Sequence, residues 1–145
     1  MPQTIRVHTV TDSEQRAQAF DIRRLVFQDE QHVPPEEEFD TDDNCATHVL
    51  AEIGGQPAGT GRIVFHPGYA KIGRMAVLSK HRRRGIGRAL MDTLVAAAVE
   101  RACTLLVLHA QVHAIPFYRA LGFQVVGREF AEAGIPHRRM ERRLR

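Results

Sequence analysis

The sequence predicts one mixed α/β domain with the element order β-α-β-β-β-α-β-α-β-β. Two patterns predict it. The turn signals Gly54-Gly55 and Pro67-Gly68 separate three strand-like runs, which together form an antiparallel meander. Apolar residues then recur at every fourth position from Ile86 to Ala98, which is a helical spacing. The chain has 145 residues, 43% hydrophobic and 26% charged, which suits a single globular domain over residues 1–145.

The first part of the chain is predicted to form a strand and an amphipathic helix. Residues 5–10 show a strand rhythm, and Thr11-Asp12-Ser13 offers side chains that cap a helix N-terminus. Apolar residues at helical spacing predict a helix over 13–27, and Pro34-Pro35 ends it or its continuation. Residues 29–43 contain eight Asp and Glu residues and no Lys or Arg. We expect this segment to be an acidic loop whose charges are mostly solvated.

The remaining elements follow from the same two periodicities and from turn residues. The apolar run Leu105–Leu108 is typical of a strand that is buried on both faces. Gly122 offers a C-terminal cap for the short helix before it. The expected elements are strands over 47–53, 58–65, 69–77 and 105–108, helices over 86–98 and 114–121, and two closing strands over 123–126 and 139–144.

Positive charge is concentrated in two segments, although the net charge is only +3. Residues 80–88 and 138–145 are rich in Lys and Arg and would attract polyanions, a class that includes nucleotide cofactors as well as nucleic acids. The sequence has no basic strand rich in aromatic residues, which argues against single-stranded nucleic acid as a partner. We therefore expect no nucleic-acid partner.

The distribution of apolar residues and cysteines indicates a cytoplasmic protein. Cys45 and Cys103 are isolated in sequence, which is typical of thiols in a reducing cytosol rather than of a disulfide framework. The apolar run 105–108 is far too short to cross a membrane. The segment Met1–Arg6 has no apolar core followed by a cleavage site, so no secretory signal is expected.

The segment Arg82–Arg88 has the composition of an anion-binding turn. It lies before a predicted helix, where about four backbone amides lack partners and the helix dipole contributes about half a positive charge. Its glycines leave these amides accessible and its arginines add charge, which favours a pyrophosphate site. A solvated basic loop explains these residues alone equally well. The candidate cofactor-binding residues in this segment are Arg82, Arg83, Arg84, Gly85, Gly87 and Arg88.

The context of this turn favours the pyrophosphate site. Arg82-x-x-Gly85-x-Gly87 follows the predicted meander and opens a long helix, and Phe117–Phe123 contains a short helix that carries Tyr118 and ends in Gly-Phe. Together these motifs resemble the two signatures of the GNAT superfamily of acetyltransferases, over essentially the whole chain. Segments that resemble its ElaA/YjcF-like branch are Arg23–Gln31, Glu38-Phe39-Asp40 with Asp43 and His48, Ala110-Gln111 with Pro116-Phe117-Tyr118, and Ala133–His137.

The resemblance implies a fold and a co-substrate. The implied fold is GNAT-like: a mixed, mostly antiparallel sheet of six to seven strands, flanked by about four helices, with strands 4 and 5 splayed apart. The implied co-substrate is acetyl-CoA, with its pyrophosphate on residues 82–88. The backbone groups of Met75 and Val77 would contact its pantetheine arm, while their side chains belong to the core.

The resemblance also implies direct transfer of an acetyl group to a primary amine in a ternary complex. Tyr118 would be the general acid that protonates the leaving thiolate, a contribution typically worth about 10²–10⁴-fold in rate. The amine must also lose a proton, and Glu30 and His109 are the candidates for the general base. The candidates for the acceptor site are Glu38, Asp40, His48 and His137.

Other chemistries find less support in the residues. His109 and His113 are four residues apart, but a predicted strand-to-helix junction separates them, so we expect no metal. Cys45 and Cys103 have no recognisable activating partner in the sequence, so nothing suggests a covalent acyl-enzyme.

Two alternative functions remain open from sequence alone. One is an acyltransferase that uses an acyl-carrier protein as donor, since Val26–Glu30 is loosely similar to enzymes of autoinducer synthesis. The other is a non-catalytic acyl-CoA-binding module. The acceptor, a small molecule or a peptide amine, is not identified by the sequence. Homodimers are common in the superfamily, and no residue pattern here decides the oligomeric state.

Overall fold

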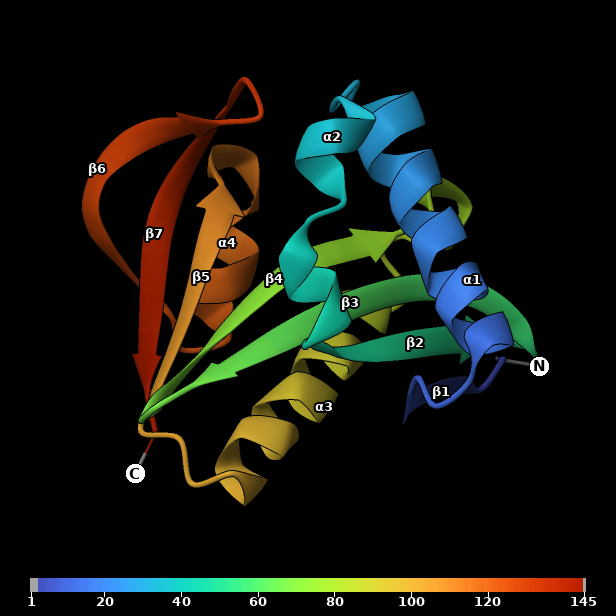
Figure 1. The fold of residues 1–145 in the computed structure, drawn as a ribbon, viewed down its shortest axis with the longest axis horizontal. Coiled ribbons are helices and arrows are strands. Elements are labelled where there is room, and N and C mark those ends of the chain that lie inside the picture. The colour runs from blue at the N-terminus through green and yellow to red at the C-terminus, as the bar shows by residue number, and fades with distance from the viewer. Residues whose placement is uncertain (1–2, 145) are drawn as a thin grey trace.

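The structure, a computed structural model, describes residues 3–144 as a seven-stranded sheet with helices on both faces (Figure 1). The strand order is β1-β2-β3-β4-β5-β7-β6, and only β4 and β5 are parallel neighbours. Met1, Pro2 and Arg145, which the predicted domain included, lie outside the described residues. The strands are β1 (Ile5–Thr9), β2 (Thr47–Ile53), β3 (Gln56–His66), β4 (Tyr69–Val77), β5 (Leu105–Gln111), β6 (Gln124–Glu132) and β7 (Ile135–Arg143).

The helices form one layer on each side of the sheet (Figure 1). One face carries α1 (Ser13–Arg23), its π-helical continuation η1 (Arg24–Glu30), α2 (Pro35–Glu38) and the 3₁₀ turn η2 (Thr41–Asn44). The other carries α3 (Ile86–Glu100) and α4 (Ile115–Ala120), with the 3₁₀ turns η3 (Ser79–His81) and η4 (Val112–Ala114) before them. This arrangement confirms the predicted fold class. None of the helices within 3–144 is long and apolar enough to cross a membrane.

Alternation along β2 divides its side chains between two cores. Val49 and Ala51 point into the larger core beneath α3, whereas Leu50 points into the smaller core beneath α1. On α3 the predicted apolar row is buried, with Leu90 and Leu94 both 0% exposed. Burial of such a side chain is worth about 1.5–3 kcal/mol, so this row anchors the helix that follows the predicted anion-binding turn.

The helix predicted over 13–27 is longer and changes its geometry. It is α-helical to Arg23 and then π-helical to Glu30. In the wider π turn, the N–H of Gln31 donates to the carbonyl of Val26, five residues earlier. The prediction ended three residues early, because the apolar spacing that identifies an α-helix is lost in a π-helix.

The expectation of a solvated acidic loop over 29–43 is wrong in part. The segment contains α2 and η2, and both Glu38 and Asp43 are buried. Each carboxylate accepts a hydrogen bond from the guanidinium of Arg23, which is itself 1% exposed. These charges enter the interior because each has an opposite charge beside it, which offsets much of the cost of removing it from water.

The two closing strands are also longer than predicted. β6 continues to Glu132 and β7 begins at Ile135, so together they form a long hairpin. The prediction ended β6 at Val126, where the register against β7 shifts before resuming at Phe130. The residues in this irregular stretch are exposed and charged or glycine, so they show no apolar alternation.

β4 and β5 pair only over their first four residues. The parallel pairing ends at Ile72 and Leu108, although both strands continue. On its other edge β4 has an extra residue relative to β3, and Arg74 there has a φ of 52°. Such a bulge bends its strand, so β4 turns away from β5 at this point. The predicted splay of strands 4 and 5 is confirmed.

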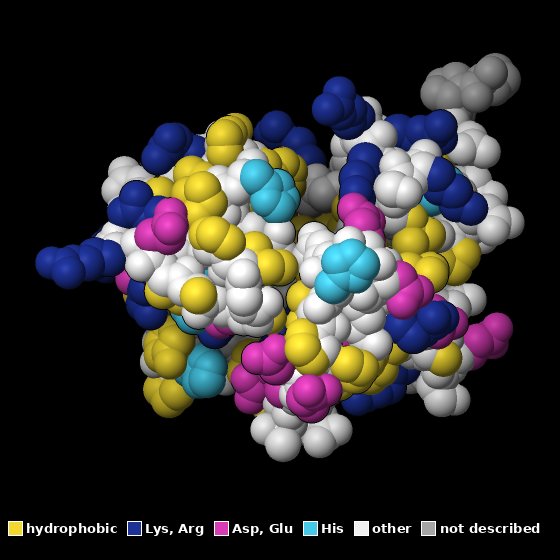
Figure 2. Space-filling view, turned by 90° about the horizontal axis from the view of Figure 1, so that it is seen from above, with side chains coloured by type: hydrophobic (Ala, Val, Ile, Leu, Met, Phe, Trp, Pro, Cys, Tyr) yellow, Lys and Arg dark blue, Asp and Glu magenta, His cyan; other side chains and the backbone are white. Residues whose placement is uncertain are grey.

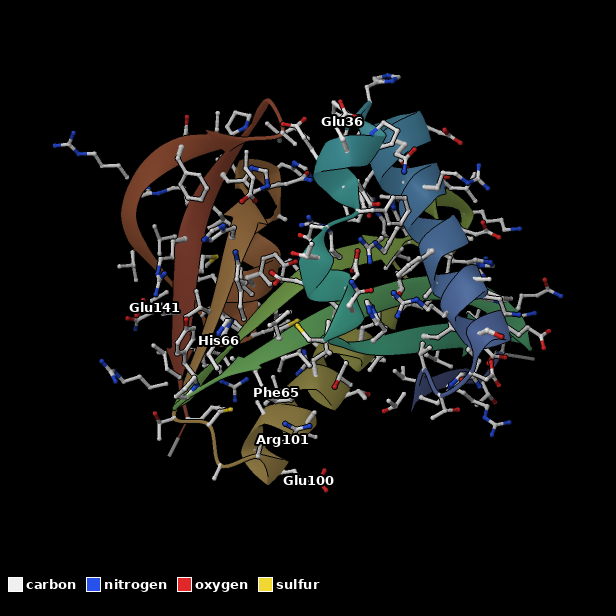
Figure 3. The ribbon with its side chains drawn as sticks, viewed as in Figure 1. Glu36, Phe65, His66, Glu100, Arg101 and Glu141 are labelled. Atoms are coloured by element: carbon white, nitrogen blue, oxygen red, sulfur yellow. The ribbon has the colours of Figure 1, made fainter. Side chains whose placement is uncertain are left out.

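The unsplayed end of the sheet is tied to α3 by a cation–π contact. Arg101, just after the helix, lies with its guanidinium carbon 4.2 Å from the centre of the Phe65 ring on β3 (Figure 3). Contacts of this kind contribute about 0.5–1 kcal/mol at exposed sites. β4 and β5 are thus paired at this end of the sheet and separated at the other.

Candidate functional site

A cleft of about 690 Å³ opens where β4 and β5 part. Its walls come from β4, β5, η1, α2, α4 and the turn between β6 and β7. In the view of Figure 2, acidic side chains gather at the lower edge of the molecule, whereas several Lys and Arg side chains lie along the upper edge. The predicted site residues that line the cleft are Glu30, Glu38, Asp40, Met75, Val77, Arg82, His109, Tyr118 and His137.

The turn before α3 presents a row of free backbone amides. The N–H groups of residues 83–88 donate no hydrogen bond to any residue within 3–144, and the first bond of α3 runs from the N–H of Ala89 to the carbonyl of Gly85 at 3.0 Å. Three of these amides belong to the first turn of the helix, where its dipole is positive. This geometry suits a phosphate group.

The two glycines of this turn serve different purposes. Gly85 caps α3 with a φ of 84°, and a Cβ added there would meet no atom within 4 Å. A Cβ added at Gly87 would lie 3.2 Å from Cζ of Phe117. Gly85 therefore allows the left-handed turn and leaves open space beside the free amides. Gly87 allows α4 to pack closely on α3, a role that the sequence did not indicate.

Arg82 is engaged with Glu30 across the cleft. Its Nη1 and Nη2 atoms each lie 2.7 Å from a different carboxylate oxygen of Glu30, and its Nε donates to the carbonyl of Val77 at 2.9 Å. The hydrogen bond from Arg82 lowers the pKa of Glu30, so this carboxylate is ionised and already occupied at neutral pH. This makes it a weak proton acceptor. The other three arginines of the turn, Arg83, Arg84 and Arg88, are exposed.

Met75 and Val77 present their backbone to the cleft. Their side chains pack against the larger core, as expected, while the strand edge beside them has lost β5 as a neighbour. The carbonyl of Val77 accepts from Arg82, but a carbonyl oxygen has two lone pairs and can accept a second bond. The free edge of β4 can therefore pair with an extended ligand.

Tyr118 on α4 offers an unpaired hydroxyl. The side chain is half-buried, and its hydroxyl makes no hydrogen bond to a residue within 3–144. Its ring is held edge-on by Phe117 at 5.0 Å and Phe123 at 6.2 Å between ring centres. Burial raises the pKa of Tyr118 to about 12. The hydroxyl therefore carries its proton at neutral pH.

His109 is the first residue of β5 beyond the pairing with β4. Leu108 and Ala110 point into the larger core, so the side chain of His109 points to the face that carries α1 and α2. Its Nδ1 lies 3.1 Å from Oε1 of Glu132, and its ring is edge-on to Phe130 at 5.0 Å. His109 is thus fixed from the β6–β7 hairpin at the mouth of the splay.

Glu132 also faces His137. Its Oε2 lies 3.7 Å from Nε2 of His137, and Nδ1 of His137 lies 2.7 Å from the carbonyl of Ile135. The hydrogen bond from His109 is the largest cause that lowers the pKa of Glu132. His109, Glu132 and His137 therefore form a connected group on the α1 face of the sheet.

Glu38, Asp40 and His48 belong to a second polar group that holds α2 and η2 on the sheet. Asp40 accepts from Nη1 and Nη2 of Arg62 at 2.7 and 3.0 Å, and the hydrogen bond from Arg62 lowers its pKa. His48 is buried, its Nε2 lies 3.0 Å from the carbonyl of Asp43, and burial lowers its pKa. His48 does not line the cleft, whereas Glu38 and Asp40 do.

The model of the acetyltransferase (GNAT) domain family matches residues 11–144 of the chain. The chain belongs to the GNAT family. It is 41% identical over 130 residues to the uncharacterized N-acetyltransferase YjcF of Bacillus subtilis (strain 168), covering 89% of this chain and 93% of YjcF. This protein is therefore an acyl-CoA-dependent N-acetyltransferase, in a family whose co-substrate is acetyl-CoA.

Two solved GNAT structures agree in fold over nearly the whole chain. Escherichia coli ElaA superposes with a TM-score of 0.84 at 27% identity, covering 96% of this chain and 99% of ElaA. An acyl-CoA N-acyltransferase from Pseudomonas aeruginosa superposes with a TM-score of 0.82 at 28% identity, covering 97% of this chain and 99% of that one. The predicted ElaA/YjcF-like branch is confirmed by these similarities.

Several residues of the GNAT cleft were missed from the sequence. Glu132 was missed because β6 was predicted to end before it. Nε2 of Gln111 donates to Oε1 of Gln31 at 2.9 Å and so joins β5 to the end of η1 across the cleft. Arg74 holds α2 through the carbonyl of Glu38 at 2.8 Å. A prediction that paired residues 124–132 with 135–143 would have placed Glu132 beside the cleft.

The described part of the GNAT chain, residues 3–144, contains no group of three or more His, Cys, Asp or Glu side chains arranged to hold a metal ion. His109 and Glu132 meet at the cleft, but His113 lies on η4 and does not join them.

Proposed function

We propose that this protein transfers the acetyl group of acetyl-CoA to a primary amine by direct attack in a ternary complex. The observation that carries the proposal is the cleft between the splayed strands. It reaches from Arg82, the first residue of the turn that carries the free amides, at one side to His109 on the α1 face at the other. A donor and an acceptor can therefore meet in it from opposite faces of the sheet.

The donor is proposed to bind along the free edge of β4. The six unpaired amides of residues 83–88 would hold the pyrophosphate, with charge added by the exposed arginines. The pantetheine arm would then lie beside Met75 and Val77 as an added strand, using backbone groups that β5 leaves unpaired. This places the thioester near Tyr118, which lines the same cleft.

The chemistry proposed for the site uses three proton transfers. The amine nitrogen attacks the thioester carbonyl carbon, the carbon–sulfur bond breaks, and the coenzyme leaves as a thiolate. Nε2 of His109 takes one proton from the incoming ammonium, which frees the lone pair for the attack. Tyr118 gives its proton to the thiolate, and the tyrosinate is reprotonated by the second proton, which the nitrogen loses as the amide forms. A tyrosine whose pKa is about 12 carries its proton at neutral pH, so Tyr118 is present in the protonated form that a general acid needs.

The acceptor is proposed to enter from the α1 face. The lining residues include Glu37, Asp42 and Glu132, whose carboxylates make no ion pair with an arginine within 3–144, and one lysine, Lys71. The lining arginines Arg62, Arg74 and Arg82 are each paired with Asp40 or Glu30. Asp40 and Glu38 are already paired with arginines. The uneven charge favours a protonated amine as the incoming molecule.

His109 and Glu30 can be separated as base candidates by substitution. We expect His109→Gln to lower kcat/KM by about 10²-fold, since general-base help is worth about 10²–10⁴-fold. Glu30→Gln should lower kcat/KM by less than about tenfold, because Glu30 is held by Arg82 and is not free to accept a proton. The measurement is the pH profile of kcat/KM for both variants. A loss of the acidic limb in Glu30→Gln, with that limb unchanged in His109→Gln, would reverse the assignment.

The function is tested by a free-thiol assay with acetyl-CoA across amines, amino sugars, polyamines and peptides. The proposal expects thiol release that depends on one class of amine, with one acetylated product per thiol by mass spectrometry. Saturable acetyl-CoA binding without acceptor-dependent release from any class would indicate a non-catalytic binding module. In a parallel assay with an acylated acyl-carrier protein as donor, thiol release seen only there would indicate an acyltransferase that uses that donor.

A further inference from the structure

Glu132 occupies a position that no motif of the chain singled out. It is the last residue of β6, and its two carboxylate oxygens face two different histidines, His109 on β5 at 3.1 Å and His137 on β7 at 3.7 Å. Phe130 packs edge-on against the first ring and stacked against the second. Glu132 itself is about 43% exposed on its side chain, so its place here is not required by core packing.

We propose that Glu132 is the positioning residue of the acetyl-transfer site: its carboxylate holds the proton of His109 on Nδ1, so that Nε2 is the atom that accepts the proton of the amine. This inference rests on the proposed function of His109, and it names the group through which that histidine is oriented.

The chemistry of the pair determines which atom carries the proton. An ionised carboxylate can only accept hydrogen bonds, so Nδ1 of His109 must be the donor. A neutral imidazole has one N–H, and its other nitrogen is then an acceptor. No residue within 3–144 makes a hydrogen bond to Nε2 of His109, which leaves that lone pair free for a ligand in the cleft.

Other charged groups near this pair come from two strands, β4 and β7. Lys71 on β4 acts on Glu132 by its charge and lowers the pKa of Glu132, as His109 and His137 do. Arg139 on β7 lies opposite His109 in the register, but its guanidinium is paired with Glu141 at 2.9 Å. Glu132 is therefore the carboxylate that contacts His109. Glu141, on β7 of the same hairpin and labelled in Figure 3, is a matched carboxylate that is paired with Arg139 instead.

The first experiment reads the tautomer of His109 directly. Long-range ¹H–¹⁵N spectra of the intact protein, at a pH where histidines are neutral, assign the His109 ring by its loss in His109→Gln. We expect the proton on Nδ1 in the wild type and in Glu141→Gln, and a shift toward Nε2 in Glu132→Leu. A wild-type proton on Nε2, or an unchanged tautomer in Glu132→Leu, would overturn the proposal.

The second experiment connects the tautomer to the reaction. We expect Glu132→Leu to lower kcat by at least about tenfold, a modest part of the usual contribution of a general base, with the KM for acetyl-CoA within about twofold of wild type. Glu141→Gln should retain wild-type kcat. Equal kcat in wild type and Glu132→Leu would contradict the positioning role. If the wild type acetylates no amine, the proposed function fails. The tautomer of His109 is measured without turnover, so that result tests the role of Glu132 independently.

Discussion

Replacing Tyr118 with phenylalanine is expected to lower kcat by about 10²–10⁴-fold, the usual loss on removing a general acid. The ring packing against Phe117 and Phe123 does not involve the hydroxyl, and the hydroxyl makes no hydrogen bond within residues 3–144. The variant therefore removes the proton donor and leaves the fold and the donor site intact. Steady-state kinetics with an identified acceptor, together with calorimetry of acetyl-CoA, give kcat and Kd separately.

The pH dependence of the wild type adds a second readout for Tyr118. Burial raises its pKa to about 12, so activity should show no loss from deprotonation of a tyrosine up to about pH 11. Tyr69 is the matched control, because it is the other tyrosine of the chain and does not line the cleft. Its ring stacks on that of His66, with 4.7 Å between the ring centres. Tyr69→Phe should keep wild-type kcat. A Tyr118→Phe enzyme with wild-type kcat would show that another group protonates the thiolate.

The largest expected effect on stability comes from Arg23→Met. Arg23 donates from Nε to Glu38 at 2.6 Å and from Nη1 to Asp43 at 2.7 Å, and its guanidinium lies over the rings of Phe20 and Phe39. Without it the buried carboxylate of Glu38 has no partner, because its second oxygen already has none within 3–144. Removing one partner of a buried ion pair costs about 3–5 kcal/mol, which corresponds to a fall in Tm of roughly 10–16 °C for a chain of this size.

Arg24→Met provides the control for this variant. Arg24 is the next residue along the helix, and its side chain is 49% exposed, with ion pairs of 3.5 Å to Asp21 and 3.8 Å to Asp29. Exposed pairs contribute about 0–1 kcal/mol, so Arg24→Met should unfold within a few degrees of the wild type. Equal melting temperatures for Arg23→Met and the wild type would show that the buried pair makes no net contribution.

The same cluster predicts how stability depends on pH. Asp43 is ionised in the folded state with its pKa held well below the usual range by Arg23 and Arg62, against the opposing effect of burial. A depressed pKa stabilises the folded state above the unfolded value of about 3.9, and this contribution is lost as the pH falls. Denaturant titrations should therefore show a nearly constant contribution from Asp43 above about pH 5 and a falling free energy of unfolding below it. A free energy of unfolding that rises below pH 4 would contradict this sign.

The fold could be predicted well wherever local patterns and final structure coincide. The glycine-rich turn at 54–55, the row from Ile86 to Ala98 and the alternation of β2 each depend on neighbours close in sequence. The burial of Glu38 and Asp43 could not be predicted in this way. Their partner Arg23 is 15 and 20 residues away, and a run of acidic residues in sequence is also what a solvated loop contains.

The candidate site also combines features set by neighbours in sequence with features set by residues far apart in sequence. The turn proposed to bind the pyrophosphate is a local feature, since the free amides of 83–88 follow from a helix start and its glycines. The neighbours of His109 are not local, because Glu132 reaches it through the pairing of β7 with both β5 and β6. The engagement of Glu30 by Arg82 joins residues 52 positions apart. Only the folded structure shows that Glu30 is held by Arg82, whereas His109 is hydrogen-bonded through Nδ1 to Glu132.

The most direct test of the account compares acetyl-CoA with S-acetylpantetheine by calorimetric titration of the intact protein. If the amides of 83–88 bind the pyrophosphate, acetyl-CoA should bind saturably at one site. S-acetylpantetheine, which lacks the pyrophosphate and the nucleotide, should bind at least about 100-fold more weakly, a difference of about 2.7 kcal/mol. Absence of acetyl-CoA binding, or equal affinity for the two compounds, would contradict the assignment of this turn as the donor site.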